Sequence, residues 1–230
     1  MADASAQPTT PPPQSPDGKS ERERIIEAFL SLLGEHSIEE IGFGQIAARA
    51  GVSLAELRNQ FGSKLAILAA YMKDIDRHVL GGIDADISEE PPRERLFDVL
   101  MRRLEALAPH KAAVRSLRRS VGRNPGLAVA LNGLSVRSQQ WMLTAADIPA
   151  SGPRGALRAQ GLALLFASVV GTWLNDDDPG LARTMSALDR ALARGERAAG
   201  LLDGVCRIPA SLCRARPRRR RDAEEETIAA

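Results

Sequence analysis

Aromatic residues are scarce in this 230-residue chain, at 3% of the sequence. Strands favour aromatic and β-branched side chains, whereas Ala and Leu, which are abundant here, favour helices. The sequence shows neither the alternating pattern of strands nor an internal repeat. It therefore predicts an all-α fold, and its length is sufficient for one or two domains with a sizeable core.

Cysteine and histidine are also rare. The two cysteines, Cys206 and Cys213, have no histidine nearby, so we expect reduced cytosolic thiols rather than a disulfide or a metal site. The three histidines are scattered, and no nucleophile signature accompanies them. The sequence therefore predicts that the protein is not an enzyme and that it holds no cofactor and no metal.

A strong net charge and a long apolar run are missing as well. The formal net charge of +2 points to no partner, and acidic and basic residues nearly balance between Lys19 and Arg77, which is weak electrostatics for a phosphate binder. The longest apolar run, Gly161–Leu174, is too short to span a bilayer and predicts a buried helix. Because no signal peptide is evident, we expect a cytoplasmic protein without a membrane span.

Composition divides the chain into segments. Residues 1–18 are rich in Pro, Ser, Thr and Gln, which predicts a disordered tail, and residues 205–230 predict a second one. The C-terminal tail contains an Arg-rich run, Arg214–Arg221, which could add sequence-independent affinity for DNA. Between the tails we expect a helix-turn-helix domain over 19–80 and a helical ligand-binding and dimerisation domain over 92–204.

The stretch Gly44–Phe61, GQIAARAGVSLAELRNQF, has the spacing of a helix-turn-helix. Ala47 is small where two helices would cross, and Gly51 tolerates the left-handed backbone of a tight turn. Leu57 is placed to fill the core beneath the second helix. The stretch therefore predicts two short helices joined by a tight turn.

Capping residues predict where helices begin. Ser53 is followed three residues later by Glu56, which is the pattern of a capping box. Asp178 is a good N-cap and Pro179 a good first-turn residue, so together they predict the start of a final helix over Gly180–Leu202.

An N-terminal helix, the segment IAARAGVS, a short helix ending at Phe61 and a long helix opening at Lys64 resemble the TetR/AcrR-type transcriptional regulators over Ser20–Tyr71. The resemblance implies a homodimer whose last two long helices form the interface. It also implies an apolar pocket in the C-terminal domain, where a small apolar or amphipathic effector changes the spacing of the two DNA-reading helices. The chain would then be a ligand-responsive repressor of a near-palindromic operator in double-stranded DNA.

Some positions depart from the family pattern. Gly42 and Gly44 stand where the family has polar side chains, and Arg58 and Gln60 stand where it prefers Tyr and His. Arg58 can replace a tyrosine as a phosphate contact. We predict the following DNA-contacting residues: Gln45, Ser53, Ala55, Arg58, Asn59, Gln60 and Lys64.

Large aromatic side chains in the C-terminal half are candidates for lining the pocket, with core packing as the alternative. The predicted ligand-binding residues are Phe97, Trp141, Phe166 and Trp173. The basic stretch Arg93–Arg123 has three possible roles: a pocket for an anionic ligand, a contact with an anionic membrane surface, or a solvated face.

A second resemblance predicts a different function. Trp173–Asp178, followed by Thr184 and Leu188–Arg190, is similar to the ubiquinone-biosynthesis accessory proteins, which have the TetR fold, hold an isoprenoid lipid and have lost DNA binding. The alternative is therefore a lipid- or quinone-intermediate-binding protein that does not bind DNA. A dimeric scaffold for a partner protein is a third hypothesis.

Overall fold

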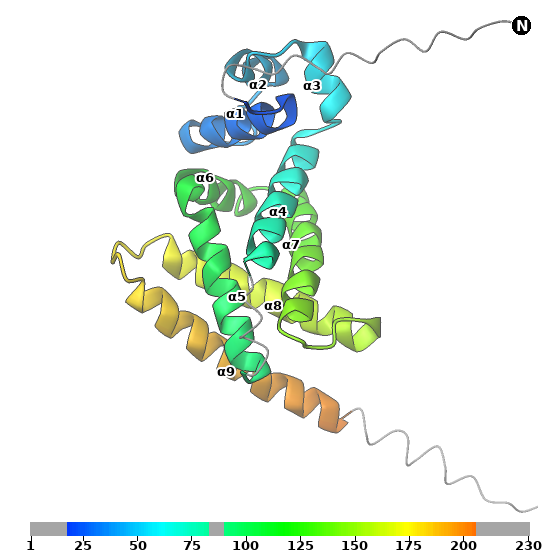
Figure 1. Ribbon diagram of the computed structural model, residues 1–230, viewed down its shortest axis with the longest axis vertical. Coiled ribbons are helices and arrows are strands. Elements are labelled where there is room, and N and C mark those ends of the chain that lie inside the picture. The colour runs from blue at the N-terminus through cyan, green and yellow to red at the C-terminus, as the bar shows by residue number, and fades with distance from the viewer. Residues whose placement is uncertain (1–17, 83–89, 206–230) are drawn as a thin grey trace, which may run out of the picture.

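The computed structural model describes residues 18–82 and 90–205, and within these ranges the chain is helical with no strand (Figure 1). The predicted all-α class is confirmed. The elements are α1 (Glu21–Glu35), α2 (Phe43–Ala50), α3 (Leu54–Gln60), α4 (Lys64–Gly81), α5 (Pro92–Leu107), the 3-10 turn η2 (Ala108–His110), α6 (Lys111–Val121), α7 (Pro125–Ala145), α8 (Gly152–Trp173) and α9 (Ala182–Val205). The tails over 1–17 and 206–230, with both cysteines and the Arg-rich run, lie outside the described residues.

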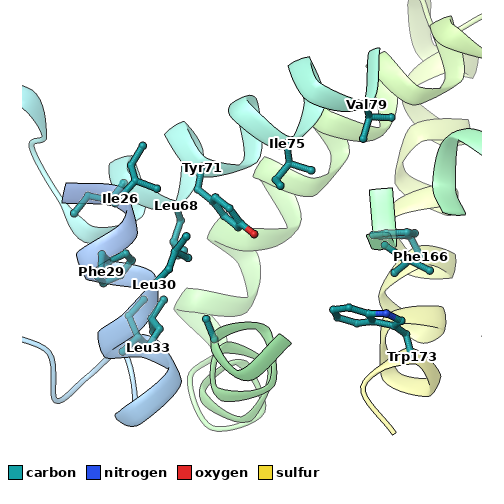
Figure 2. Close-up of a cluster of buried hydrophobic side chains, with 14 of the residues drawn as sticks. Ile26, Phe29, Leu30, Leu33, Leu68, Tyr71, Ile75, Val79, Phe166 and Trp173 are labelled. Carbon is teal, nitrogen blue, oxygen red and sulfur yellow. The ribbon is translucent and has the colours of Figure 1, made fainter. Parts of the chain in front are cut away.

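Helices α1, α2 and α3 lie together at one end of the molecule, and α4 leads from them into the rest of the bundle (Figure 1). α1 begins after Ser20, whose hydroxyl accepts a hydrogen bond from the N–H of Glu23 at 3.3 Å. Its apolar residues recur at helical spacing and are buried. Figure 2 shows Phe29 and Leu30 of α1 facing Leu68 of α4. These contacts fix the helix-turn-helix on the first turns of α4.

The remaining helices form a bundle around the lower part of α4. α4 packs against α5 and α7, α8 packs against α7 and α9, and α6 packs against α1. One continuous apolar core runs from Ile25 in α1 to Leu192 in α9. The α1–α6 contact therefore gives the helix-turn-helix end a second attachment to the bundle, in addition to α4.

Cations of α6 bind the C-terminal end of α8. Lys111 Nζ donates to the carbonyl of Asp176 at 2.8 Å, and Arg115 Nη2 donates to the carbonyl of Leu174 at 2.5 Å. The Lys111 ammonium also lies 5.5 Å from the ring centroid of Trp173. Carbonyls at a helix C-terminus carry partial negative charge, so this end of α8 explains part of the basic stretch without an anionic ligand or a membrane.

The start of α9 corrects the prediction. The helix begins at Ala182 and not at Gly180, because Leu181 has a φ of +51°, a left-handed conformation that an α-helix cannot include. Asp178 still serves as a capping residue: its carboxylate accepts from the N–H groups of Gly180 at 3.1 Å and Ala182 at 3.2 Å.

The buried carboxylate of the α8–α9 loop is Asp176. Its Oδ2 accepts from Thr184 Oγ1 at 2.6 Å and from the Thr184 N–H at 2.8 Å, and both residues are buried. The hydrogen bond from the Thr184 side chain is the main cause that lowers the pKa of Asp176. This ionised, bonded carboxylate ties the loop to the first turn of α9.

Candidate nucleic-acid interface

The chain reverses direction between α2 and α3 at Gly51. This residue has φ +63° and ψ +41°, a backbone conformation that is unfavourable for residues with a Cβ. The N–H of Val52 donates to the carbonyl of Ala47 at 3.0 Å and closes the end of α2. Ala47 has a small side chain and is 4% exposed, as expected where two helices lie close together. The predicted turn is confirmed.

Two apolar residues attach α3 to the protein. Leu57 is 3% exposed, and Phe61, which follows the helix, is 7% exposed. The other residues of α3 are exposed. Because each residue advances about 100° around a helix, Ala55 and Asn59 lie opposite Leu57, with Arg58 beside them. α3 therefore presents a small residue, an amide and a guanidinium outward.

Glu56 caps the helix it belongs to. Its carboxylate accepts from the N–H of Ser53 at 2.6 Å, and the Ser53 hydroxyl accepts from the N–H of Glu56 at 3.2 Å. The bond from the Ser53 backbone is the main cause that lowers the pKa of Glu56. The negative charge near the outer face is therefore held at the helix N-terminus, where it satisfies backbone donors.

Arg58 is the cation of α3. Its Nη1 lies 3.4 Å from the carbonyl of Gly62, which is a weak hydrogen bond at the C-terminal end of the helix. A guanidinium carries five N–H donors, so this bond leaves capacity for a phosphate. Arg58 is thus placed as the sequence pattern requires, and the phosphate contact itself stays a prediction.

Two predicted contact residues make bonds within the protein. Lys64 Nζ donates to the carbonyls of Ile38 at 2.5 Å and Ile41 at 3.0 Å. Gln45 Oε1 accepts from the N–H of Gly42 at 2.7 Å, which caps α2 although Gly42 has no side chain. An ammonium has three donors and an amide has two more, so both side chains retain hydrogen-bonding capacity. Their DNA contacts stay predictions.

Other cations near the turn are also bound internally. Arg24 Nη1 donates to the carbonyl of Ala50 at 3.1 Å, at the C-terminal end of α2. Arg49 pairs with Glu35 of α1 at 2.8 Å. The outward positive charge of α3 itself therefore rests on Arg58.

Sequence reasoning missed two exposed apolar residues beside this face. Leu54 is 59% exposed and Phe43 is 44% exposed, and they are the first residues of α3 and α2. Once Ser53 is taken as the N-cap, Leu54 must be the first helical residue, and residues at that position project from the helix end. That capping signal could have identified Leu54.

Solved structures of other proteins share the fold of this chain. A TetR transcriptional regulator from Rhodococcus sp. RHA1 is 26% identical with a TM-score of 0.55, and the match covers 76% of this chain and 95% of that one. The chain therefore has the fold of a TetR-type regulator. The TetR transcriptional regulator from Nitrosomonas europaea, at 23% identity, shows the same fold with a TM-score of 0.61 over 77% of this chain and 99% of that one.

Curated relatives match a shorter part. The HTH-type transcriptional regulator BetI from Cronobacter sakazakii is 29% identical over 98 residues, which is 41% of this chain and 48% of the relative. BetI from Yersinia pestis (strain Pestoides F) is 35% identical over 78 residues, 33% of this chain and 39% of the relative. The chain thus matches less than half the length of these relatives. No protein-family model matches it.

The four predicted ligand-binding residues have different environments. Phe166 is 8% exposed and Trp173 is 1% exposed, and both belong to the core with the partly buried Phe97. Trp141 is 58% exposed. Trp141 lies outside the core because α7 buries the side on which Ser138 and Met142 lie, and the ligand contacts of all four residues stay predictions.

α8 is long and apolar enough, by length and composition, to cross a membrane. The core helix of a globular protein passes the same test, so this single helix is weak evidence for a span. In the TetR fold of this chain α8 packs between α7 and α9. Among residues 18–82 and 90–205, no group of three or more potential metal-ligating side chains occurs.

Proposed function

We propose that the protein is a cytoplasmic, ligand-responsive transcriptional regulator that acts as a repressor by binding a near-palindromic operator as a homodimer. The observation that carries the proposal is the exposed outer face of α3, formed by Ala55, Arg58 and Asn59, on a helix fixed by Leu57. A short helix anchored on one side and polar on the other is the form that enters a major groove. We propose that residues 19–80 form the DNA-binding part and residues 92–204 the ligand-binding and dimerisation part.

Each exposed residue of α3 has a role in this proposal. Arg58 contacts a phosphate and fixes the register of the protein on the duplex. Asn59 reaches base edges, where an amide can pair with adenine, and Ala55 leaves room for close approach. Contacts to the sugar-phosphate backbone of the DNA come from Gln45, Ser53, Gln60 and the remaining donor of Lys64.

The dimer interface is proposed on α8 and α9. Leu157 and Leu164 of α8 are 54% and 61% exposed, and Met185 of α9 is 39% exposed. Large exposed apolar side chains on two helices that pack together favour burial against a partner. A surface hollow of about 500 Å³, lined by Thr172 and by residues of α9, lies on the same helix pair. A second copy of the chain would cover these side chains.

The effector site is proposed inside the helical part, with Phe166 and Trp173 among its apolar residues. α4 could transmit a change at this effector site to the DNA-binding part, because the helix begins directly after the helix-turn-helix and continues into the bundle. α6 supports a second link. Its Ser116 hydroxyl donates to the carbonyl of His36 at 2.8 Å, and its Ser120 hydroxyl donates to Glu39 at 2.9 Å. Movement of either helix would shift the reading helix.

Binding to the promoter region of its own gene, measured by gel retardation at several salt concentrations, tests the regulator. We expect specific binding that weakens steeply with salt. Arg58→Ala should weaken binding and reduce the salt slope by about 1, since one phosphate contact is lost. Arg77→Ala is the matched control, because Arg77 is exposed on α4 and away from α3. Equal binding by the two variants would contradict the phosphate contact.

The alternative is a lipid- or quinone-intermediate-binding protein that does not bind DNA. The observation in its favour is that Arg49 is paired with Glu35 and that Arg24 and Lys64 donate to carbonyls of the protein, which leaves fewer of their N–H donors for phosphates. Solvent extraction of the purified protein distinguishes the lipid-binding hypothesis from the regulator hypothesis. A co-purified isoprenoid lipid, together with only non-specific DNA binding, would favour the alternative and reject the regulator.

A further inference from the structure

A hollow of about 310 Å³ lies where the helix-turn-helix meets the bundle. Its lining comes from the loop before α2 and the first residue of α2, from the start of α4, and from the start of α7. α4 and α7 run side by side (Figure 1). We call this the junction hollow. Its volume is at the lower end of the range for small-molecule pockets, about 300–1,000 Å³, which suits a ligand of amino-acid size.

Two opposite charges line the junction hollow, those of Glu39 and Lys64. The Glu39 carboxylate accepts from the Ser120 hydroxyl at 2.9 Å, and Lys64 Nζ donates to the carbonyl of Ile38 at 2.5 Å. The hydrogen bond from its own backbone N–H is the main cause that lowers the pKa of Glu39, so the carboxylate is ionised at neutral pH. Within the part of the chain that the structure describes, neither charge forms an ion pair.

The two charges lie close enough for one small ligand to reach both. Because the Lys64 ammonium bonds to the carbonyl of Ile38, it lies beside the peptide that joins Ile38 to Glu39. An ammonium has three donors and a carboxylate has about four acceptor sites, so each group retains hydrogen-bonding capacity. A molecule that carries an ammonium and a carboxylate on one carbon atom matches this arrangement.

Large apolar side chains form another part of the lining. Ile38 and Leu127 are 5% and 8% exposed, and Leu65 of α4 is partly buried. Phe43 contributes an aromatic ring but is 44% exposed. An apolar group in the hollow would remove part of this ring and of its own surface from water, which is favourable.

We propose that the junction hollow binds a free α-amino acid with an apolar side chain, such as leucine. Glu39 accepts from the ligand ammonium, Lys64 donates to the ligand carboxylate, and Phe43 and Leu127 contact the ligand side chain. The unpaired opposite charges select a zwitterion, because a ligand with a single charge leaves one charge of the protein without a partner. The site is distinct from the proposed effector residues Phe166 and Trp173, which lie on α8.

Occupancy of the junction hollow has a consequence for DNA binding that rests on the proposed function. That function assigns the remaining donor of Lys64 to the sugar-phosphate backbone of the DNA. A ligand carboxylate would use the same donor, so the amino acid and the DNA would compete for Lys64. Gel retardation of the promoter fragment should therefore weaken as L-leucine is added, and unchanged retardation at saturating L-leucine would reject this competition.

Three probes that share one branched carbon chain test the site by isothermal titration calorimetry at neutral pH and without DNA. L-leucine carries both charges, isoamylamine carries only the ammonium, and isocaproate carries only the carboxylate. We expect saturable binding of L-leucine and binding about tenfold weaker for each single-charge probe, since each loses one charged hydrogen bond. Equal or tighter binding of either single-charge probe, or no binding of L-leucine, would overturn the inference.

A charge variant shows whether L-leucine occupies the junction hollow. Glu39→Gln keeps an acceptor for Ser120 but removes the charge, so it should weaken L-leucine binding about tenfold and leave isocaproate binding unchanged. Glu40→Gln is the matched control on the next residue, where the carboxylate accepts from the Ser37 N–H and a glutamine carbonyl can do the same. Equal L-leucine binding by the two variants would reject the contact with Glu39.

A second variant tests the apolar part of the site. Phe43→Ala should weaken L-leucine binding about fivefold, because the ligand side chain loses the aromatic surface that it covers. Val129→Ala is the control, since Val129 is a 74% exposed apolar residue of α7 outside the hollow. Unchanged binding in both Glu39→Gln and Phe43→Ala would reject the site. Calorimetry contains no DNA, and retardation without L-leucine tests the regulator, so the two hypotheses fail separately.

Discussion

The start of α3 and the end of α8 are fixed by different kinds of contact. Ser53 and Glu56, three residues apart, cap the N-terminus of α3 by bonding to each other's backbone. The C-terminus of α8 is bound by Lys111 and Arg115 of α6, which lie 65 and 59 residues away from their carbonyl partners. The first arrangement needs only the local sequence, whereas the second exists only in the folded bundle.

This difference runs through the two halves of the molecule. In the helix-turn-helix, short-range caps and one left-handed glycine set the backbone, and the outer face stays exposed. In the bundle, charged side chains join helices that are distant in sequence, and one such pair, Arg103 with Asp76, is buried. We therefore expect substitutions of local caps to have small effects and substitutions of the buried network to have large ones.

The largest expected effect is that of Arg103→Ala. It leaves Asp76 buried without its counter-ion, which should reduce the free energy of unfolding by about 3–5 kcal/mol in urea denaturation. Arg77→Ala is the control, since Arg77 forms an exposed pair with Asp74 at 2.7 Å and should change stability by less than about 1 kcal/mol. Equal losses of unfolding free energy in the two variants would contradict the expected difference between buried and exposed charges.

A pair of glycine substitutions in the bundle should have opposite signs. A Cβ at Gly155 would overlap the backbone of Ala150, so Gly155→Ala should lower the free energy of unfolding by about 1–3 kcal/mol. Gly133 is exposed on α7 with no atom near a Cβ, so Gly133→Ala should raise it by about 0.5–1 kcal/mol. Thermal denaturation of both variants measures this, and a stabilised Gly155→Ala would contradict the close packing.

Loss of the α3 cap should have a moderate effect. Ser53→Ala removes the hydroxyl that accepts from the Glu56 N–H and should cost about 1 kcal/mol in the free energy of unfolding. Ser53→Asp is the control, because aspartate also accepts at an N-cap and should retain the stability. If both variants lose the same amount, the contribution of Ser53 is not capping.

The smallest expected effect concerns pH. Burial is the main cause that lowers the pKa of His110 below 6.5, and its ring meets Tyr71 edge-on with centroids 5.3 Å apart. The unfolded chain therefore takes up the proton first as the pH falls. Stability from this residue is complete above pH 6.5 and decreases below it, by at most about 1.4 kcal/mol per pH unit.

Unfolding of the wild type and of His110→Phe between pH 8 and pH 5 checks this expectation. The wild type should lose stability relative to His110→Phe as the pH falls, because phenylalanine has no proton to bind. A difference that is constant with pH would show that His110 does not titrate differently in the folded and unfolded states.

The sequence by itself determined the helix-turn-helix. Gly51 in its left-handed turn and Ser53 at the start of α3 depend on neighbours within a few residues, so local chemistry fixes them. The burial of Leu57 and Phe61 followed from helical spacing. The same local logic placed Arg58 and Asn59 on the exposed side of α3.

Only the tertiary structure decided how polar side chains are used. It showed Lys64 bound to the carbonyls of Ile38 and Ile41, Trp141 at the surface, and Asp176 as the buried carboxylate of the α8–α9 loop. It also joined Arg103 to Asp76, 27 residues away. The physical reason is that a charge or a large ring has its energy set by what surrounds it, and packing brings together residues that no local spacing relates.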